Sequence, residues 1–292
     1  MTSVVRRISQ ITQPRGGYVN PRTMETIQLG DGHTQVLDHK AENIHATTMG
    51  MAVDYLSRLA NGAEPGDAFQ ISIRGAVRLH AREVITTLDL GRLTPVVDVD
   101  YLRSEPEARE MEYIADALLN LEALRPGLIP DDDAIRAAVH LVGYDIAFRV
   151  GPDFYVDQRS IPDAATIAHI RTMVERAVAF FTSHGPITED GFRPVNRQSM
   201  TEVVDSGDGD FLTADTLWDF KVSVSPPTNK HTLQLLMYLI MGRHSGQDQY
   251  GSLTHLGIFN PRLNTVYRFA YADVPGDVVS AVSHDVIGYA LA

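Results

Sequence analysis

The strongest constraint on the fold of this chain is a change in its hydrophobic pattern near residue 200. Before that point, apolar residues recur at helical spacing in five segments and predict helices over residues 42–60, 74–90, 107–124, 131–142 and 162–181. Beyond it, apolar patterns predict short strands at 201–204, 216–221, 253–260 and 265–271, with helices at 229–241 and from residue 276. We therefore expect a helical region that leads into a β-β-α-β-β-α unit.

No linker or low-complexity tract separates these two regions. We therefore expect one domain over residues 1–292, with a helical part at about 40–185 and a β-rich core at about 195–292. The first forty residues are polar and interrupted by Gly and Pro, so we expect them to be irregular.

Composition excludes several classes of protein. The chain has no cysteine, which rules out disulfides, zinc–thiolate sites and thiol nucleophiles. It contains neither the roughly 18-residue apolar run of a membrane helix nor an apolar N-terminal signal, so we expect a cytoplasmic protein without a membrane partner. It also lacks a P-loop and a dinucleotide-binding fingerprint, which argues against helicase or NTPase activity.

The charges of the chain are unevenly distributed. The net charge of −12 argues against a protein that coats nucleic acid electrostatically. Residues 202–219 nevertheless hold six acids and no Lys or Arg, whereas residues 220–247 hold three Lys or Arg, two His and no acid. An acidic pocket followed by a basic stretch suits a metal site that receives a polyanion, and chance clustering is the alternative.

The segment 207–221 carries the residues with the clearest chemistry. Asp219 and Lys221 are two positions apart on a predicted strand, so their side chains leave the same face, while Phe220 points toward a core. Asp210 and Asp219 would offer two carboxylates, and the Phe220 carbonyl a third oxygen, to Mg²⁺ or to Mn²⁺ as a substitute. Lys221 would then contact a phosphate oxygen or the attacking water. An ordinary hairpin with solvated acids and a surface lysine is the simpler alternative.

Gly207-x-x-Asp210 followed by Asp219-Phe220-Lys221 resembles the core motif of the PD-(D/E)xK nuclease superfamily, particularly its RecB-like exonuclease branch. The Gly-x-x-Asp spacing favours Asp210 over Asp208 as the first ligand. The resemblance implies an α/β (α+β) fold with a restriction-endonuclease-like core, in which a central mixed β-sheet is flanked by helices. The helical N-terminal region would be an addition to that core.

The RecB-like branch also has a helix with Gln-x-x-x-Tyr after the lysine strand. Gln234 and Tyr238 match this pattern, and residues four apart share one helical face. The resemblance implies that Gln234 supports the active site or contacts DNA; a buried amide with satisfied hydrogen bonds is the alternative. Lys230, one turn earlier on the same face, is either a phosphate contact or a solvated lysine.

One element departs from the pattern of the branch, which has Gly-x-x-x-His on an N-terminal helix, with the histidine at the metal. The nearest match here is Gly50-Met51-Ala52-Val53-Asp54, which places an aspartate at the histidine position. Asp54 is either a hard oxygen ligand suited to Mg²⁺ or an exposed helix residue. His45 is a weaker substitute.

These observations predict a Mg²⁺-dependent deoxyribonuclease that hydrolyses phosphodiester bonds, with Asp210 and Asp219 at the metal and Lys221 at the water. Two alternatives are a catalytically inactive nuclease fold that binds nucleic acid or joins an assembly, and an RNA-directed nuclease used in defence or as a toxin. The sequence points to no specific protein partner or homo-oligomeric state.

Overall fold

The computed structural model describes residues 2–30, 37–84, 112–156 and 160–290. The chain forms two compact units. Met1–Val36 and Ala179–Ala292 make up the first, which we call the sheet unit, and Leu37–Val178 makes up the second, the helical unit. None of the helices in these described ranges is long and apolar enough to cross a membrane.

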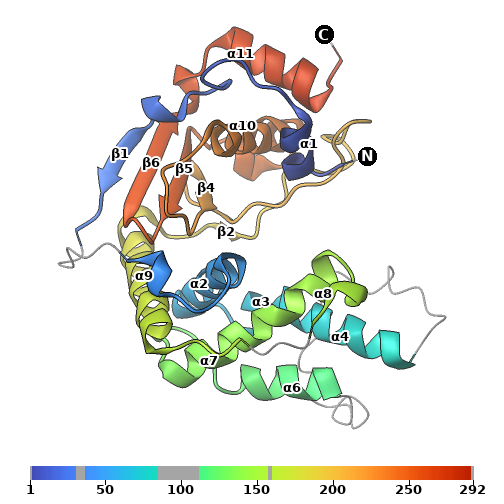
Figure 1. Cartoon of the computed structure of the whole chain (residues 1–292). Coiled ribbons are helices and arrows are strands. Elements are labelled where there is room, and N and C mark those ends of the chain that lie inside the picture. Colours follow the sequence, from blue (N-terminus) through green and yellow to red (C-terminus); the bar gives the residue numbers. More distant parts are fainter. Residues whose placement is uncertain (1, 31–36, 85–111, 157–159, 291–292) are drawn as a thin grey trace. The chain divides into compact units, whose positions relative to one another are not determined.

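The sheet unit is built on one six-stranded mixed sheet with the strand order β1-β6-β5-β4-β3-β2 (Figure 1). Its strands are β1 (Glu25–Gln28), β2 (Glu189–Asp190), β3 (Phe211–Leu212), β4 (Thr216–Phe220), β5 (His255–Asn260) and β6 (Thr265–Ala270). Among the described strands of this sheet, β4 and β5 pair in parallel and the other neighbours pair antiparallel. The order β3-β4-α10-β5-β6-α11 matches the predicted β-β-α-β-β-α order and the mixed sheet is confirmed, but β3 takes the place of the first predicted strand, 201–204.

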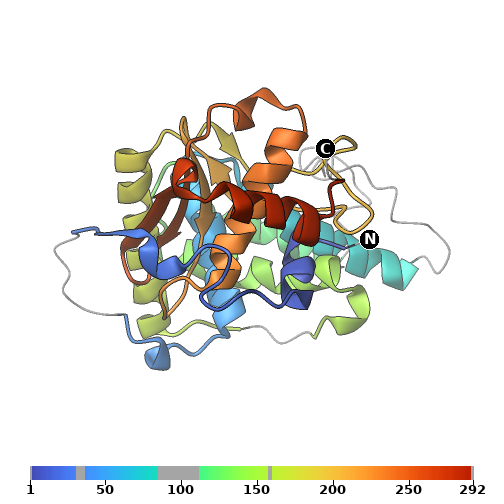
Figure 2. The ribbon, with the colours of Figure 1, turned by 90° about the horizontal axis from the view of Figure 1, so that it is seen from above.

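Helix α10 (Asn229–His244) connects β4 to β5 and packs on one face of the sheet. Its apolar residues form a core with Leu212, Leu217, Leu256 and Ile258. The ends of the described chain pack on this helix, through α1 (Val4–Gln10) and through α11 (Gly276–Ala281) with the π-helix that continues it (Val282–Ile287). In Figure 2 the C-terminal helices, in dark red, lie over α10, in orange.

An aromatic cluster covers the other face of the sheet. Phe180, near the C-terminal end of α9 (Ala164–His184), stacks on Phe259 of β5 with ring centroids 4.2 Å apart. Phe180 also meets Trp218 edge-on, with centroids 5.0 Å apart. Trp218 and Phe220 are 1% and 8% exposed, so both positions of β4 point into a core, as predicted for Phe220. Alternation along the strand then places Asp219 on the α10 face.

The helical unit confirms the predicted helices, with shifted ends. It contains α2 (Ala46–Ala60), α3 (Pro65–Ala68), α4 (Gln70–Val84), α6 (Glu112–Leu121), α7 (Asp132–Leu141), α8 (Asp145–Arg149) and most of α9. The predicted helical stretches 85–90 and 107–111 lie outside the described residues.

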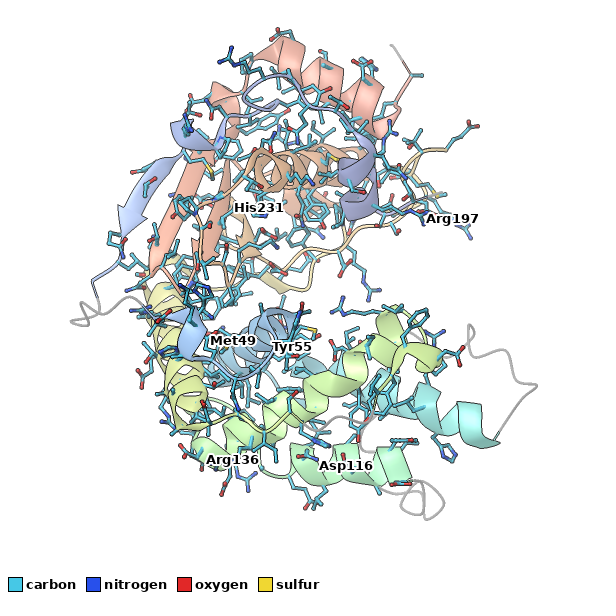
Figure 3. All side chains as sticks on the ribbon, viewed as in Figure 1. Met49, Tyr55, Asp116, Arg136, Arg197 and His231 are labelled. Atoms are coloured by element: carbon cyan, nitrogen blue, oxygen red, sulfur yellow. The ribbon has the colours of Figure 1, made fainter. Side chains whose placement is uncertain are left out.

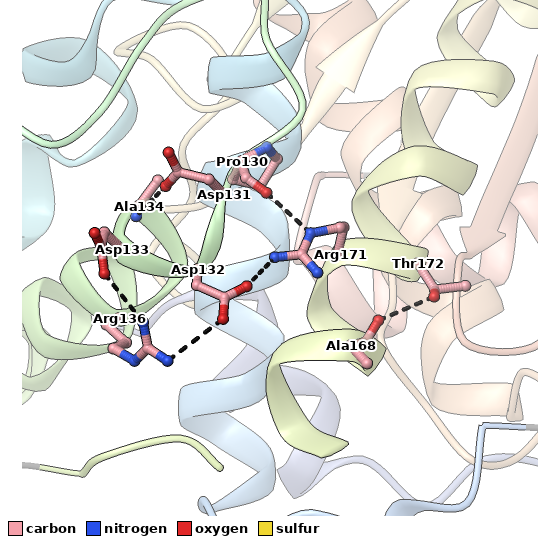
Figure 4. Close-up of polar contacts among 9 residues, drawn as sticks. All are labelled: Pro130, Asp131, Asp132, Asp133, Ala134, Arg136, Ala168, Arg171 and Thr172. Atoms are coloured by element: carbon pink, nitrogen blue, oxygen red, sulfur yellow. Dashed lines mark hydrogen bonds and ion pairs between the residues drawn. The ribbon is translucent and has the colours of Figure 1, made fainter. Parts of the chain in front are cut away.

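The first turn of α7 is acidic, with Asp132 and Asp133 in it (Figure 4). Asp131 caps the helix by accepting the Ala134 N–H at 2.9 Å. Asp132 pairs with Arg171 of α9, and Arg136 bonds to Asp132 at 3.4 Å. The negative charges complement the positive end of the helix dipole.

A buried polar network lies deeper in the helical unit. The Asp145 carboxylate, 1% exposed, accepts hydrogen bonds from the Tyr55 hydroxyl and the Ser72 hydroxyl, each at 2.6 Å. Arg149 approaches the same carboxylate at 3.5 Å and donates to the Tyr55 hydroxyl at 3.2 Å. Burial raises the pKa of Asp145, and these bonds partly oppose that rise.

The predicted strand at residues 201–204 is wrong. These residues form a turn, in which the Thr201 hydroxyl accepts the N–H groups of Val203 and Val204 at 3.2 and 3.0 Å. Such local bonds occupy the backbone groups that a ladder would need. The hairpin is instead β3–β4, closed by the bond from Thr213 N to Thr216 O at 3.0 Å.

Two further predictions require correction. The first forty residues are not irregular throughout, because α1 and β1 lie within them and β1 pairs with β6. The helix predicted at 229–241 does not end at residue 241, because α10 continues to His244. A Cβ at Gly242 would lie 2.3 Å from the ring of Tyr250, so this glycine allows close packing inside the helix.

Candidate functional site

Asp219 is a buried acid near the C-terminal end of β4. Its side chain is on the α10 face, and the residue is only 2% exposed. Oδ1 accepts a hydrogen bond from Lys221 Nζ at 2.6 Å. Among the described residues, no donor bonds to Oδ2, which is also buried. A carboxylate oxygen in this state carries a large desolvation cost unless a cation or donor joins it.

Asp210 lies beside Asp219. The β3–β4 register pairs Phe211 with Trp218, so its continuation places Asp210 opposite Asp219. Asp210 Oδ2 accepts the backbone N–H of Phe220 at 2.5 Å. The N–H and C=O of one strand residue face the same neighbouring strand, so the Phe220 carbonyl points to the Asp210 side. The predicted oxygens of Asp210, Asp219 and Phe220 thus come together at one end of the hairpin.

The glycines around Asp210 have a packing role. A Cβ on Gly207 would lie 3.0 Å from Val4 Cγ2 and 3.1 Å from Tyr238 Cε1. A Cβ on Gly209 would lie 1.9 Å from the ring of Phe192. These contacts pack the chain before Asp210 tightly against Val4 of α1, Phe192 and Tyr238 of α10, which positions the Asp210 carboxylate.

Gln234 and Tyr238 lie on the face of α10 that is turned toward these acids. Gln234 Nε2 donates to the Tyr238 hydroxyl at 3.2 Å. Burial raises the pKa of Tyr238, and the charges of Asp219, Asp208 and Asp210 raise it further, against the hydrogen bond from Gln234. The phenol therefore stays protonated, and Gln234 is a half-buried amide with at least one partner.

His231 is a site residue that the sequence reasoning did not identify. It lies at the start of α10, beside the sheet (Figure 3), three residues before Gln234. Burial lowers the pKa of His231. The nearby Asp219 carboxylate raises this pKa, and the Lys221 ammonium lowers it further. The spacing of His231, Gln234 and Tyr238, at i, i+3 and i+7, was the signal that could have found it.

The remaining candidates are more exposed or belong to the other unit. Lys230 and Asp208 are both exposed to solvent. Asp54 lies on α2 of the helical unit, where it is half-buried. His45 caps α2, because its Nδ1 accepts the Thr47 N–H at 3.2 Å.

The donor set around Asp219 consists of hard oxygen atoms. Two carboxylates and a backbone carbonyl are the hard oxygen donors that Mg²⁺ selects, with water filling the other positions. The buried Oδ2 of Asp219 supports a cation here, since it lacks a hydrogen-bond donor within the described ranges. Across the same ranges, no group of three or more His, Cys, Asp or Glu side chains could hold a metal. Two carboxylates and one carbonyl suit a hydrated cation that takes few protein ligands.

Comparison of the chain with protein-family models, curated proteins and solved structures gave no significant match. The geometry around Asp219 is therefore the basis for assigning a function.

Proposed function

We propose that this protein is a Mg²⁺-dependent nuclease of the PD-(D/E)xK type, with a restriction-endonuclease-like core. The observation that carries the proposal is the Asp219 carboxylate, which is buried, bonded to Lys221 on one oxygen and without a donor on the other among the described residues. Its neighbours Asp210 and the Phe220 carbonyl supply the other oxygens. DNA is the proposed substrate.

Each residue has a role in phosphodiester hydrolysis. Asp210, Asp219 and the Phe220 carbonyl would hold the cation, which when bound neutralises phosphate charge and lowers the pKa of water. Lys221, whose ammonium is held by Asp219, contacts a phosphate oxygen or orients the attacking water. The buried Tyr238 and its partner Gln234 support the acids from α10. Lys230 is a proposed phosphate contact at the exposed edge.

Cleavage of nucleic acid tests this proposal. Linear and circular DNA, single- and double-stranded, and single-stranded RNA are incubated with Mg²⁺ or Mn²⁺ and resolved on gels. We expect wild-type cleavage of DNA and a loss of about 10²-fold or more in Lys221→Ala and Asp219→Asn. The exposed residues Asp273 and Lys40 provide matched controls, so Asp273→Asn and Lys40→Ala keep wild-type rates.

The outcome also separates the alternatives. Cleavage of RNA alone favours the RNA-directed nuclease. If the wild type cleaves none of the substrates with either cation, the proposal is wrong and the inactive binding fold is favoured.

A further inference from the structure

His231 has its ring fixed by the first turn of α10. The Thr228 side chain accepts the His231 backbone N–H, and His231 Nδ1 accepts the Thr228 backbone N–H at 3.2 Å. This is a capping box in which an imidazole takes the place usually held by Glu or Gln. The cap anchors the ring at one nitrogen and so restricts its rotation.

The cap also determines where the proton of the ring lies. A backbone N–H can only donate, so Nδ1 must present its lone pair to Thr228. A neutral imidazole with an unprotonated Nδ1 carries its proton on Nε2. No hydrogen-bond partner of Nε2 is found within the described part of the chain. His231 therefore offers an N–H donor and has no second lone pair for a metal.

The surroundings of this donor suit an anion. His231 interacts electrostatically with Lys221 and with Asp219, the pair at the centre of the proposed site. His231 precedes Gln234 and Tyr238 on the same helical face, which is turned toward β4. A phosphate group that reaches Lys221 would thus meet a second donor from the start of α10, where the helix dipole is positive.

We infer that His231 is a phosphate-binding residue, which donates its Nε2–H to a non-bridging oxygen of the nucleic-acid phosphodiester held at Asp219 and Lys221. This inference rests on the proposed nuclease function for the identity of its ligand. The bond positions the phosphate without transferring a proton. His231 therefore acts through binding of the substrate, and its loss raises KM more than it lowers kcat.

Two substitutions separate the donor from the cap. His231→Glu keeps an acceptor for the Thr228 N–H and preserves the capping box, but it removes the donor and adds a negative charge. His231→Gln keeps the cap acceptor and retains an N–H donor. His244→Glu makes the same charge change at the far end of α10, about 20 Å away by helical rise, and serves as the control.

Binding is measured with a short fluorescent single-stranded DNA, and with RNA of the same sequence, in Ca²⁺, with intact probe verified on gels. We expect His231→Glu to raise Kd about tenfold or more, His231→Gln to recover most of that loss, and His244→Glu to bind as the wild type does. Unchanged Kd in a folded His231→Glu, with wild-type cleavage, overturns the inference and leaves the nuclease proposal standing. If the wild type binds but does not cleave, and His231→Glu binds more weakly, the nuclease proposal is overturned and the inference about His231 stands. A wild type that binds neither probe and cleaves none of the nucleic-acid substrates overturns both.

The tautomer has its own test, which is independent of nuclease activity. Long-range ¹H–¹⁵N correlation spectra of the metal-free protein should show a protonated Nε2 and an unprotonated Nδ1 for His231. A protonated Nδ1 with an unprotonated Nε2 would overturn the inference even if the protein binds DNA.

Discussion

Asp219 of the sheet unit and Asp145 of the helical unit are both buried acids, with 2% and 1% exposure. Their partners differ. Both oxygens of Asp145 accept short hydroxyl bonds, from Ser72 and Tyr55, and Arg149 adds a charge. Asp219 has Lys221 on one oxygen and, within the described residues, no donor on the other.

The hydrogen-bond partners of a buried acid distinguish a structural residue from a candidate ligand. Burial of a carboxylate is costly, and the structure offsets that cost at Asp145 with hydrogen bonds from the chain itself. At Asp219 the offset is incomplete, which leaves one oxygen ready for a cation. We therefore interpret Asp145 as a structural residue and Asp219 as a ligand.

The largest expected effect is the loss of activity in Asp219→Asn. Removal of the charge that holds the cation should lower kcat/KM for DNA by about 10²-fold or more. Lys221 keeps 32% of its side chain exposed, so water can solvate its ammonium and the free energy of unfolding should change by less than about 1 kcal/mol. Gel assays and urea denaturation measure the two quantities. A large loss of stability would make Asp219 a structural acid like Asp145.

Asp145→Ala should lower the stability of the protein without lowering its activity, the opposite of Asp219→Asn. The substitution leaves the hydroxyls of Tyr55 and Ser72 buried without their acceptor, so we expect a loss of about 2–5 kcal/mol in the free energy of unfolding. The rate of cleavage per folded molecule should stay at the wild-type value. Denaturation monitored by circular dichroism gives the first quantity, and active-site titration gives the second.

Tyr55→Phe removes a single member of the same network. The Tyr55 hydroxyl donates to Asp145 and accepts from Arg149, so we expect a loss of about 1–3 kcal/mol in the free energy of unfolding. A double-mutant cycle with Asp145→Asn checks that the two residues act together. Additive losses would show that the hydrogen bond contributes little.

The raised pKa of Asp145 predicts a pH dependence of stability. The folded state holds this proton more tightly than the unfolded state does, so the contribution of Asp145 falls as pH rises from about 3.9, the ordinary value, through the higher folded pKa. The free energy of unfolding of the wild type minus that of Asp145→Asn should therefore decrease over this range. A difference that increases with pH would mean a lowered pKa.

The smallest effect is expected at the surface of the helical unit. Arg136 pairs with Asp132 and Asp133, but its side chain is 46% exposed and that of Asp133 is 89% exposed. Arg136→Ala should change the free energy of unfolding by no more than about 0.5 kcal/mol. A loss comparable to that of Tyr55→Phe would show that surface ion pairs contribute as much to the free energy of unfolding as the buried network does.

The sequence predicted the parts of the structure that depend on local pattern. Alternation along β4 correctly predicted that Asp219 and Phe220 lie on opposite faces of the strand. Helical spacing correctly predicted that Gln234 and Tyr238 lie on the same face of their helix. The network around Asp145 had no such signal, because its partners lie 73 and 90 residues away in the chain.

Strand β1 was missed for a related reason. Its residues Glu25–Gln28 are mostly exposed and show no apolar alternation, and the strand forms by pairing with β6 at the other end of the sequence. Tertiary pairing of this kind overrides local propensity. His231 was overlooked because a histidine in a first helical turn looks ordinary until its neighbours on β4 are known.

Calorimetric titration of Mg²⁺ into the wild type, Asp219→Asn and Asp145→Asn measures whether Asp219 is a cation ligand and Asp145 is not. We expect the wild type and Asp145→Asn to bind Mg²⁺ with the same Kd, and Asp219→Asn to bind at least about tenfold more weakly. Equal affinity in the wild type and Asp219→Asn would contradict this expectation.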